Sequence, residues 1–532
     1  FEARAIFTGA PKSLPEVPAS AKAAGFWLGY PKLADTVSYF SPPGESSGTL
    51  ARAAARGQRV SFTFAIRTLK DFGEAKVTCA DLSGPNGKIP AANVDLRYVH
   101  NELNRSFNDL AYTIAPKGLR RASSGATLPK DFTRQFWVTV SVPADAKPGK
   151  YAAEVTVAAG ALKQSVPLAV EVLDVVLDEA DFPRGYFGVH APSELAGARR
   201  GTAMAELLTV LRAHGMSSFT GGPGIPFTGL AADGKPMLDF SACDAFFKTA
   251  KECGFTQDVF SYGGPAMVDG LHDGYVIGAT GHGWEQKTGK SFGELLKIVW
   301  AAVDEHAKQA GWPRVKYGLN DEPRTIESAR EQLELQKAYR DHVPSVPTGG
   351  FYSVHWSDEE FDKVVQETFK TLTWSGLNLY AQVDFDKAKE FGRELVMYNQ
   401  KGTRFAFGQY SWARMSQGFK GYMQWHTGAI SGMQFFDLDG REPDFAIAQW
   451  GREEIIPTLD LARAREGVDD LRFAVTLANR AKKNASDPAA KAALDWLAQQ
   501  TAAVPADKRD GPEGDEFRDG CIGHLKKLMP QR

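Results

Sequence analysis

Two neighbouring carboxylates stand out in the stretch "VKYGLNDEPRT", which runs from Val315 to Thr325. An apolar run typical of a buried strand ends here, and Asp321 and Glu322 follow it directly. Side chains alternate between the two faces of a regular strand, but past the strand end both carboxylates can converge. Pro323 disfavours helical geometry at Glu322 and so restrains its direction. The pattern predicts a paired acid site; alternatively, the two acids only begin the following helix, where carboxylates are favoured.

Such a pair suits acid–base catalysis, because two close carboxylates repel and one of them then carries a proton at neutral pH. We expect Glu322 to be that proton carrier and Asp321 to stay ionised. Hydrolysis of a glycosidic bond normally takes two carboxylates. In the large superfamily of barrel glycosidases that have an Asn-Glu acid site after the fourth strand, the second is a Glu that ends the seventh strand, but the matching segment here, "MYNQKG" at 397–402, holds no carboxylate. Glu394 lies at the wrong end of that strand. The attacking group must therefore come from elsewhere, and a neighbouring acetamido group of the substrate is a known alternative.

The elements that position this pair are short apolar runs that alternate with helical segments such as 202–215 and 291–311. The runs lie at 185–192, 217–223, 258–265, 314–323, 346–353, 372–380, 394–400 and 421–428. Eight strand–helix units match a (β/α)8 TIM barrel, in which chemistry takes place at the carboxyl ends of the strands. A doubly wound open sheet is the alternative, but no G-x-G-x-x-G motif follows any of these runs. The acidic pair therefore follows the fourth strand of a predicted barrel.

Residues before the barrel show a different period. Apolar side chains alternate along 134–143, 148–157 and 165–177, which is typical of strands buried on one face. These strands predict an immunoglobulin-like β-sandwich, and the turn-rich segment 143–150 predicts a hairpin between two of them. We expect three parts: a β-sandwich at 1–181, a catalytic barrel at 182–455, and at 456–532 a C-terminal helical segment packed on the barrel.

Aromatic and amide side chains at other strand ends are candidates for substrate binding. Tyr380, Tyr398 and Trp425 follow the sixth, seventh and eighth strands, where a ring can stack on a sugar or simply fill the barrel core. Tyr380 is the preferred contact for an acetamido carbonyl. Asn320 and Asn399 are candidates for hydrogen bonds to sugar hydroxyls, or for capping and turn positions.

Histidines and further acids near the strand ends are weaker candidates. His190 ends the first strand and His426 the eighth, so each reaches the predicted site or serves a structural role. Asp437 and Asp439 follow the eighth strand, where they are ligands or turn residues. The glycine-rich segment 270–284 is long enough for a cleft wall or lid. No histidine pair has ligand spacing and no Cys/His cluster exists, so we expect neither a metal nor a cofactor.

The composition and charge of the chain limit the kinds of partner that we expect. The 532 residues carry a net charge of −2 with both signs interspersed, which argues against nucleic acid as a partner. No apolar run approaches the ~20 residues of a membrane span. The four cysteines are scattered; a bond between Cys243 and Cys253 and free thiols are both open. The sequence starts at Phe1, which is consistent with a removed leader.

Three segments, in this order, resemble glycoside hydrolase family 123 and its close relatives. They are "VPADAKPGKYAAEVTV" (142–157), "DEP" (321–323) and "PTLDLARAREGVDDLRF" (457–473). The resemblance implies a β-N-acetylgalactosaminidase in which Glu322 is the general acid/base and Asp321 orients the 2-acetamido group. It also implies an oxazoline-type intermediate and net retention. At the seventh strand the chain departs from the family's aromatic cluster and keeps only Tyr398.

The sequence thus favours a retaining exo-β-N-acetylgalactosaminidase that uses substrate-assisted catalysis. One alternative is a hydrolase of a different glycoside, in which Glu322 works with a distant carboxylate such as Asp437. Another is a non-catalytic carbohydrate-binding barrel. In each case the partner is a carbohydrate, and the resemblance together with the start at Phe1 predicts a periplasmic or secreted protein. The exact sugar, its linkage and the oligomeric state stay open.

Overall fold

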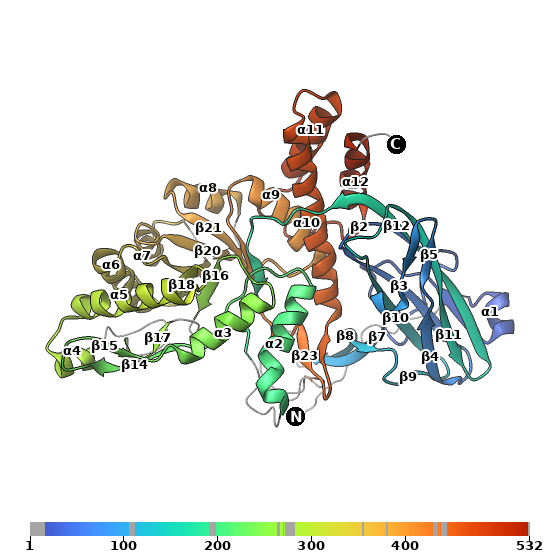
Figure 1. Ribbon diagram of the computed structural model, residues 1–532, viewed down its shortest axis with the longest axis horizontal. Coiled ribbons are helices and arrows are strands. Elements are labelled where there is room, and N and C mark those ends of the chain that lie inside the picture. The colour runs from blue at the N-terminus through green and yellow to red at the C-terminus, as the bar shows by residue number, and fades with distance from the viewer. Residues whose placement is uncertain are drawn as a thin grey trace.

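The computed structural model describes residues 16–105, 112–190, 198–262, 267–269, 271, 282–353, 356–378, 381–428, 435, 437 and 444–529, without the side chains of 198–200 and 282. Figure 1 shows a β-sandwich on one side, an α/β domain on the other, and the long helix α10 (Leu459–Lys483) between them.

Two sheets form the N-terminal β-sandwich. The first has the order β1 (Phe26–Gly29), β3 (Arg59–Thr68), β10 (Thr133–Ser141), β7 (Val94–Arg105), β8 (Tyr112–Arg121). The second runs β2 (Leu50–Arg56), β12 (Leu162–Val176), β11 (Gly149–Ala159), β4 (Gly73–Cys79), β9 (Ala126–Leu128), with β5 (Leu82–Gly84) and β6 (Gly87–Ile89) beside β11. Helix α1 (Ala19–Ala24) and the 3₁₀ turn η1 (Ala91–Asn93) flank them.

The alternating apolar residues of the sandwich strands are buried on one face of each strand, as predicted. Phe136, Val138 and Val140 of β10 are buried in the core between the two sheets, as are Val155 and Val157 of β11. Alternate side chains of a strand point to the same face, so this spacing buries one face of each strand. The prediction of a β-sandwich is confirmed.

The predicted hairpin across 143–150 is wrong. β10 pairs with β3 and β7 in one sheet, whereas β11 pairs with β12 and β4 in the other, so the segment crosses between the sheets. β11 instead forms its hairpin with β12, through a turn at Gly160 with φ +52°. Turn-forming residues signal a change of direction, but they do not choose the partner strand.

A parallel sheet forms the centre of the α/β domain. Its order is β13 (Arg184–Tyr186), β22 (Tyr422–Gln424), β21 (Glu394–Tyr398), β20 (Trp374–Asn378), β19 (Thr348–Ser353), β18 (Val315–Asp321), β16 (Val259–Tyr262). The segment 217–220 joins the two edges, because Thr220 N donates to Tyr186 O at 3.1 Å and Phe260 N donates to Phe219 O at 3.1 Å. The sheet therefore curls into a barrel-like form, as the alternation of strands and helices predicted.

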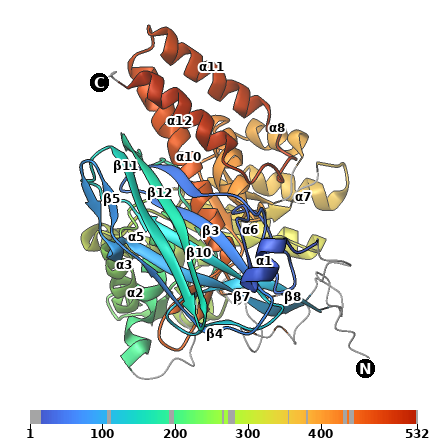
Figure 2. The same cartoon turned by 90° about the vertical axis from the view of Figure 1, so that its right-hand side faces the viewer.

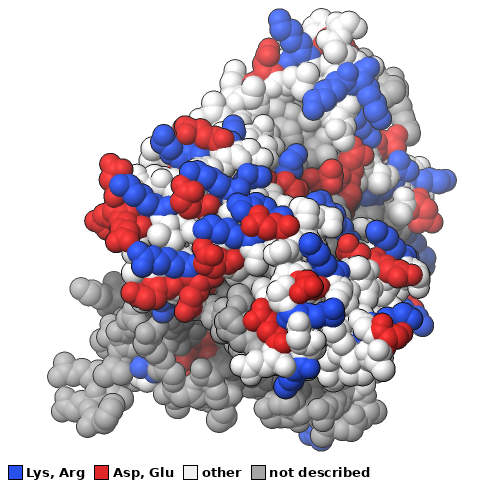
Figure 3. Space-filling model, turned by 90° about the vertical axis from the view of Figure 1, so that its left-hand side faces the viewer, with Lys and Arg blue, Asp and Glu red and all other residues white. Residues whose placement is uncertain are grey.

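Helices cover the outside of the curled sheet (Figure 1). They are α2 (Ala198–Ala213), α3 (Ser241–Glu252), α4 (His282–Thr288), α5 (Phe292–Ala310), α6 (Ile326–His342), α7 (Glu360–Phe369), α8 (Gln382–Glu390), the π-helical turn η2 (Ala406–Tyr410) and α9 (Ser411–Ser416). Short strands lie in the connections: β14 (Ile225–Leu230), β15 (Pro236–Leu238), β17 (Val268–Asp269), β23 (Ala448–Trp450) and β24 (Ile455–Pro457). Basic and acidic side chains intermix over the described part of the face in Figure 3.

The C-terminal helices α10, α11 (Pro488–Ala502) and α12 (Glu516–Leu528) contact one another and extend beyond the sandwich (Figure 2). Helix α10 contacts the sandwich as well as the barrel-like domain, and buried charges join the parts. Glu466 pairs with Arg52 of β2 at 2.9 Å and with Arg518 of α12 at 2.7 Å. Asp470 pairs with Arg404 at 2.7 Å and with Arg518 at 2.6 Å. This ionic network explains the charged residues of the segment 457–473.

Two further expectations concern the cysteines and the membrane. All four cysteines are free, so Cys243 and Cys253 form no disulfide. Within the described residues, no helix is both long and apolar enough to cross a membrane.

Candidate active site

A register shift in β18 sets the direction of the acidic pair. In the pairing with β19, Leu319 has no partner between Gly318 and Asn320. A side chain at Gly318 would face Phe351 and Trp374. Both belong to a buried cluster inside the curled sheet, called the aromatic cluster below, which consists of Phe187, Phe260, Phe351, Trp374, Val396, Tyr398 and Met423. Regular alternation from Gly318 would therefore turn Asn320 inward and the next residue outward. Because Leu319 is an extra residue in β18, this order is reversed, as in a β-bulge, so that Asn320 points outward and Asp321 inward.

Asp321 consequently faces the interior of the sheet. The hydroxyl of Tyr262, at the end of β16, donates to its carboxylate, and the Tyr262 ring packs edge-on against Phe187 and Phe351 of the aromatic cluster. Gln332 of α6 donates to the backbone carbonyl of Asp321 at 3.0 Å. The carboxylate is thus held by a side chain from another strand end, at the edge where chemistry takes place in barrels.

Burial raises the pKa of Asp321, and the nearby Glu322 carboxylate adds to the rise. The hydrogen bond from Tyr262 opposes both effects, because it stabilises the ionised form. This direction differs from the expectation that Asp321 is the carboxyl that ionises readily. The pKa is raised because the bulge turns Asp321 toward the packed interior of the curled sheet, where burial disfavours the charged form.

Glu322 is held by the two strand ends that come next around the sheet. Its Oε1 accepts from Nδ2 of Asn378 at 2.8 Å, at the end of β20, and from the hydroxyl of Ser353 at 3.0 Å, at the end of β19. Its backbone N donates to Phe351 O at 2.8 Å. Sequence reasoning missed Asn378 and Ser353, although their position at the end of predicted strands was a usable signal.

The alternative that both acids belong to the first turn of the following helix is wrong. Helix α6 begins at Ile326, and Thr325 is its N-cap, whose side chain accepts from Ser328 N at 3.2 Å. Asp321 ends β18 and Glu322 precedes the cap. Neither carboxylate is therefore occupied in capping this helix.

Tyr398 lies close to both carboxylates. Burial raises the pKa of its hydroxyl, and the charges of Glu322 and Asp321 raise it further. Its ring centroid is 4.9 Å from that of Phe351 and 5.1 Å from that of Phe187. Tyr398 therefore keeps a neutral hydroxyl beside the acid pair, while its ring belongs to the aromatic cluster.

The other described candidates have different neighbours. Trp425 packs on the aromatic cluster, with its ring centroid 5.8 Å from that of Phe187. The rings of His190, which is exposed, and His426 are 6.0 Å apart. Burial and the neighbouring His190 lower the pKa of His426 to about 4, so it is neutral at neutral pH. Asn399 accepts from Nε2 of Gln424 at 2.8 Å.

The structure does not bring Asn320 to the acid pair. Its side chain is buried against α6, where its Oδ1 accepts from Nε2 of Gln336 at 2.6 Å. Asp437 lies at the junction with the sandwich, where it accepts from the backbone N of Arg105 at 2.9 Å and of Asp444 at 3.1 Å.

Several expectations fall outside the described residues: Tyr380, Asp439 and most of 270–284. Among the residues that are described, no group of three or more His, Cys, Asp or Glu side chains is arranged to hold a metal ion.

Known proteins resemble this chain in one domain and in overall fold. Residues 40–159 match the family model of the glycoside hydrolase 123 N-terminal domain. The fold is similar to that of a family 123 glycoside hydrolase from Clostridium perfringens, with a TM-score of 0.64, 12% identity, and coverage of 94% of this chain and 97% of that chain. A xylanase of family GH10 from termite gut, with a bacterial Ig-like domain, aligns with a TM-score of 0.33 and 10% identity over 79% of this chain and 99% of that one. No curated protein matches the sequence. The chain has the N-terminal domain of glycoside hydrolase family 123 and the overall fold of a family 123 enzyme, which confirms the resemblance predicted from its sequence.

Proposed function

We propose that this protein is a retaining exo-β-N-acetylgalactosaminidase in which the 2-acetamido group of the substrate is the nucleophile. The observation that carries the proposal is the arrangement of Asp321 and Glu322. They are adjacent in sequence, yet each is held by polar side chains from other strand ends, Tyr262 for the first and Asn378 with Ser353 for the second. Two differently supported carboxylates are what separate roles require.

In the first step, Glu322 donates its proton to the glycosidic oxygen while the acetamido carbonyl oxygen attacks the anomeric carbon. The bond to the leaving group breaks, the aglycone departs with the proton, and a cyclic oxazolinium forms. Asp321 accepts the acetamido N–H and stabilises the positive charge that develops on the ring. This added donor favours the ionised form of Asp321, which counters the rise in its pKa caused by burial.

In the second step, the Glu322 carboxylate takes a proton from water, and the water oxygen attacks the anomeric carbon. The ring opens, the acetamido group is restored, and two inversions give net retention. The hydrogen bonds from Asn378 and Ser353 fix one oxygen of Glu322 and leave the other, Oε2, for the proton transfer. Tyr398 is suited to contact the acetamido group, because its hydroxyl stays protonated beside the two acids.

The end of β21 also favours a nucleophile from the substrate. That strand ends with Tyr398, and its only carboxylate, Glu394, pairs with Lys316 at 3.0 Å at the opposite end of the strand. Asp437, the acid considered for the alternative mechanism, is engaged by backbone N–H groups at the sandwich junction. Neither is positioned as a partner of Glu322.

The test is a set of carboxamide variants with aryl N-acetyl-β-galactosaminides. Asp321→Asn should lower kcat for every leaving group, because the acetamido group loses its charged partner. Glu322→Gln should lower kcat by about 10²- to 10⁴-fold for a poor leaving group and far less for a dinitrophenyl group, which needs no proton.

Glu327→Gln is the matched control, since Glu327 lies in the first turn of α6 and takes no part in the site. A thiazoline analogue of the oxazoline should inhibit strongly. Near wild-type turnover of a substrate with a poor leaving group in either acid variant, or indifference to the thiazoline, would retire the mechanism.

A further inference from the structure

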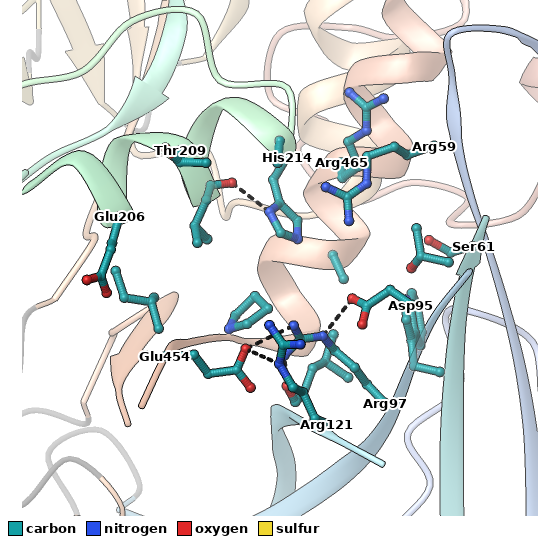
Figure 4. Close-up of a pocket in the computed structure, with 18 of the residues that line it drawn as sticks. Arg59, Ser61, Asp95, Arg97, Arg121, Glu206, Thr209, His214, Glu454 and Arg465 are labelled. Carbon is teal, nitrogen blue, oxygen red and sulfur yellow. Dashed lines mark hydrogen bonds and ion pairs between the residues drawn. The ribbon is translucent and has the colours of Figure 1, made fainter. Parts of the chain in front are cut away.

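A cavity of about 510 Å³ lies between the sandwich, helix α2 and helix α10, and Figure 4 shows its lining. Its volume is within the range of small-molecule sites. The lining contains neither acid of the proposed catalytic pair nor any side chain that holds them. The cavity is therefore a separate feature, formed where the sandwich meets the helices.

Four arginines line this cavity, and they differ in their partners. Arg97 pairs with Asp95 at 2.7 Å and with Glu454 at 3.3 Å, and Arg121 pairs with Glu454 at 2.7 Å. The charges of these two arginines are thus matched by acids of the same wall. The Arg59 guanidinium, by contrast, makes no hydrogen bond and no ion pair with any of the described residues.

Arg465 of α10 also has a guanidinium group whose hydrogen-bond donors are not all paired with described residues. It is 8% exposed, and its Nε is buried with no hydrogen-bond partner among the described residues. Its close carboxylate is Asp469 at 3.2 Å, one turn further along α10. That carboxylate is shared, because it also accepts from Gln58 at 3.1 Å and pairs with Arg472 at 3.5 Å.

In Figure 4 the side chain of Arg59 extends toward the His214 ring, whereas the guanidinium group of Arg465 is turned along α10, away from that ring. The like charges of the two arginines repel: burial lowers the pKa of Arg59, and the charge of Arg465 lowers it further. An anion placed between them would relieve that repulsion and supply the acceptors that the guanidinium groups lack. Guanidinium groups bind carboxylate, sulfate and phosphate through paired N–H donors.

His214 adds a different kind of contact. Its Nδ1 lies 2.7 Å from Val210 O, and because a carbonyl oxygen only accepts, Nδ1 carries the proton. Burial, together with the charges of Arg59 and Arg465, lowers the pKa of His214 to about 3, so its ring is neutral near neutral pH. The second ring nitrogen is turned toward the cavity in Figure 4 and offers a lone pair, which suits a hydroxyl donor rather than an anion.

We propose that this cavity between the sandwich and the helices binds a hydroxylated organic anion of monosaccharide size, such as a sugar acid. Its acid group pairs with Arg59 and Arg465, and one of its hydroxyls donates to His214. Because Arg59 comes from the sandwich and Arg465 from α10, the ligand joins the two parts of the molecule. The site is separate from the proposed catalytic centre and does not depend on its activity.

Isothermal titration calorimetry on the full chain tests this directly, with glucuronate as the probe, and with glucose and inorganic sulfate as comparisons at matched ionic strength. Glucuronate should bind more tightly than sulfate, and glucose should not bind at this site. Arg59→Gln should weaken glucuronate binding by about tenfold or more, the loss of a charge-assisted contact. Arg59→Lys, which keeps the positive charge but loses the paired N–H donors of the guanidinium group, should give an intermediate affinity.

Arg121→Gln is the matched control, because Arg121 lines the same cavity but is already paired with Glu454. It should bind glucuronate like the wild type, and a thermal melt without ligand checks that each variant is folded. Equal loss in the two glutamine variants, sulfate binding as tight as glucuronate, or no binding of glucuronate would overturn the proposal.

Discussion

The hydrogen bond between Tyr262 and Asp321 offers a sharp test of the proposed chemistry. The change is Tyr262→Phe, which removes one hydroxyl and keeps the ring that packs on Phe187 and Phe351. The hydroxyl donates to the carboxylate and so favours its ionised form. Without it, burial and the neighbouring Glu322 act unopposed by Tyr262, and the pKa of Asp321 rises further.

The size of the shift follows from the strength of such a bond. A hydrogen bond to a charged group contributes about 1.5–3 kcal/mol. Since 1.36 kcal/mol corresponds to one pKa unit, the pKa of Asp321 should rise by about 1–2 units. The proposed mechanism needs ionised Asp321, so activity should be lost as the pH falls through this pKa. The acidic limb of the profile of kcat/KM against pH should move upward by the same amount.

The assay is the hydrolysis of an aryl N-acetyl-β-galactosaminide over a range of pH, because kcat/KM reports the pKa values of the free enzyme. Tyr352→Phe is the matched control. Tyr352 is buried close enough to Asp321 for that charge to raise its own pKa, but its hydroxyl has no hydrogen-bond partner among the described residues. Its profile should coincide with that of the wild type. An acidic limb that stays in place in Tyr262→Phe, or moves to lower pH, would refute the reasoning.

Three further outcomes follow from the same contacts. Asn378→Ala should lower kcat for aryl glycosides by about tenfold or more with an unchanged circular dichroism spectrum, because Glu322 loses a charge-assisted bond of 2.8 Å; unchanged kcat would remove Asn378 from the mechanism. Glu466→Gln should lower the free energy of unfolding in urea by about 3–5 kcal/mol, because it leaves buried arginines unpaired. Glu334→Gln removes an exposed i,i+3 pair and should change it by less than about 1 kcal/mol, and similar losses in both would count against the network. Burial alone would raise the pKa of Glu466, but the surrounding arginines outweigh it and hold that pKa below the ordinary 4.5. This contribution to stability is therefore complete above pH 4.5 and is lost as the pH falls further, so unfolding midpoints measured below pH 4.5 should drop more steeply in the wild type than in Glu466→Gln.

The local patterns of the sequence determined the kinds of element and the edge of the sheet at which the proposed site lies. Period-two apolar residues such as Phe136, Val138 and Val140 bury one face of a strand wherever that strand pairs, so the sandwich was predictable. Alternation of short apolar runs with helices predicted a (β/α)8 barrel, and the structure has a barrel-like curled parallel sheet covered by helices. The same alternation placed Asp321 and Glu322 after the fourth predicted strand, at the edge that the carboxyl ends of parallel strands share.

Register and long-range contacts were decided only by the tertiary structure. One unpaired residue, Leu319, turns Asp321 inward and Asn320 toward α6, and no local pattern announces a shift that depends on the neighbouring strand. The partners of Glu322 come from two other strands, 31 and 56 residues away in the chain.

The same holds for helix α10. Its sequence predicted a helix packed on the barrel, but its buried charges also pair with the sandwich and with α12. Ion pairs between residues that are distant in sequence, and the cavity beside Arg59 and Arg465, form only when the sandwich and the helices pack together. Periodicity is a property of a few consecutive residues, whereas a site is a property of segments brought together by packing, which is why the sequence predicted the elements and the fold decided their contacts.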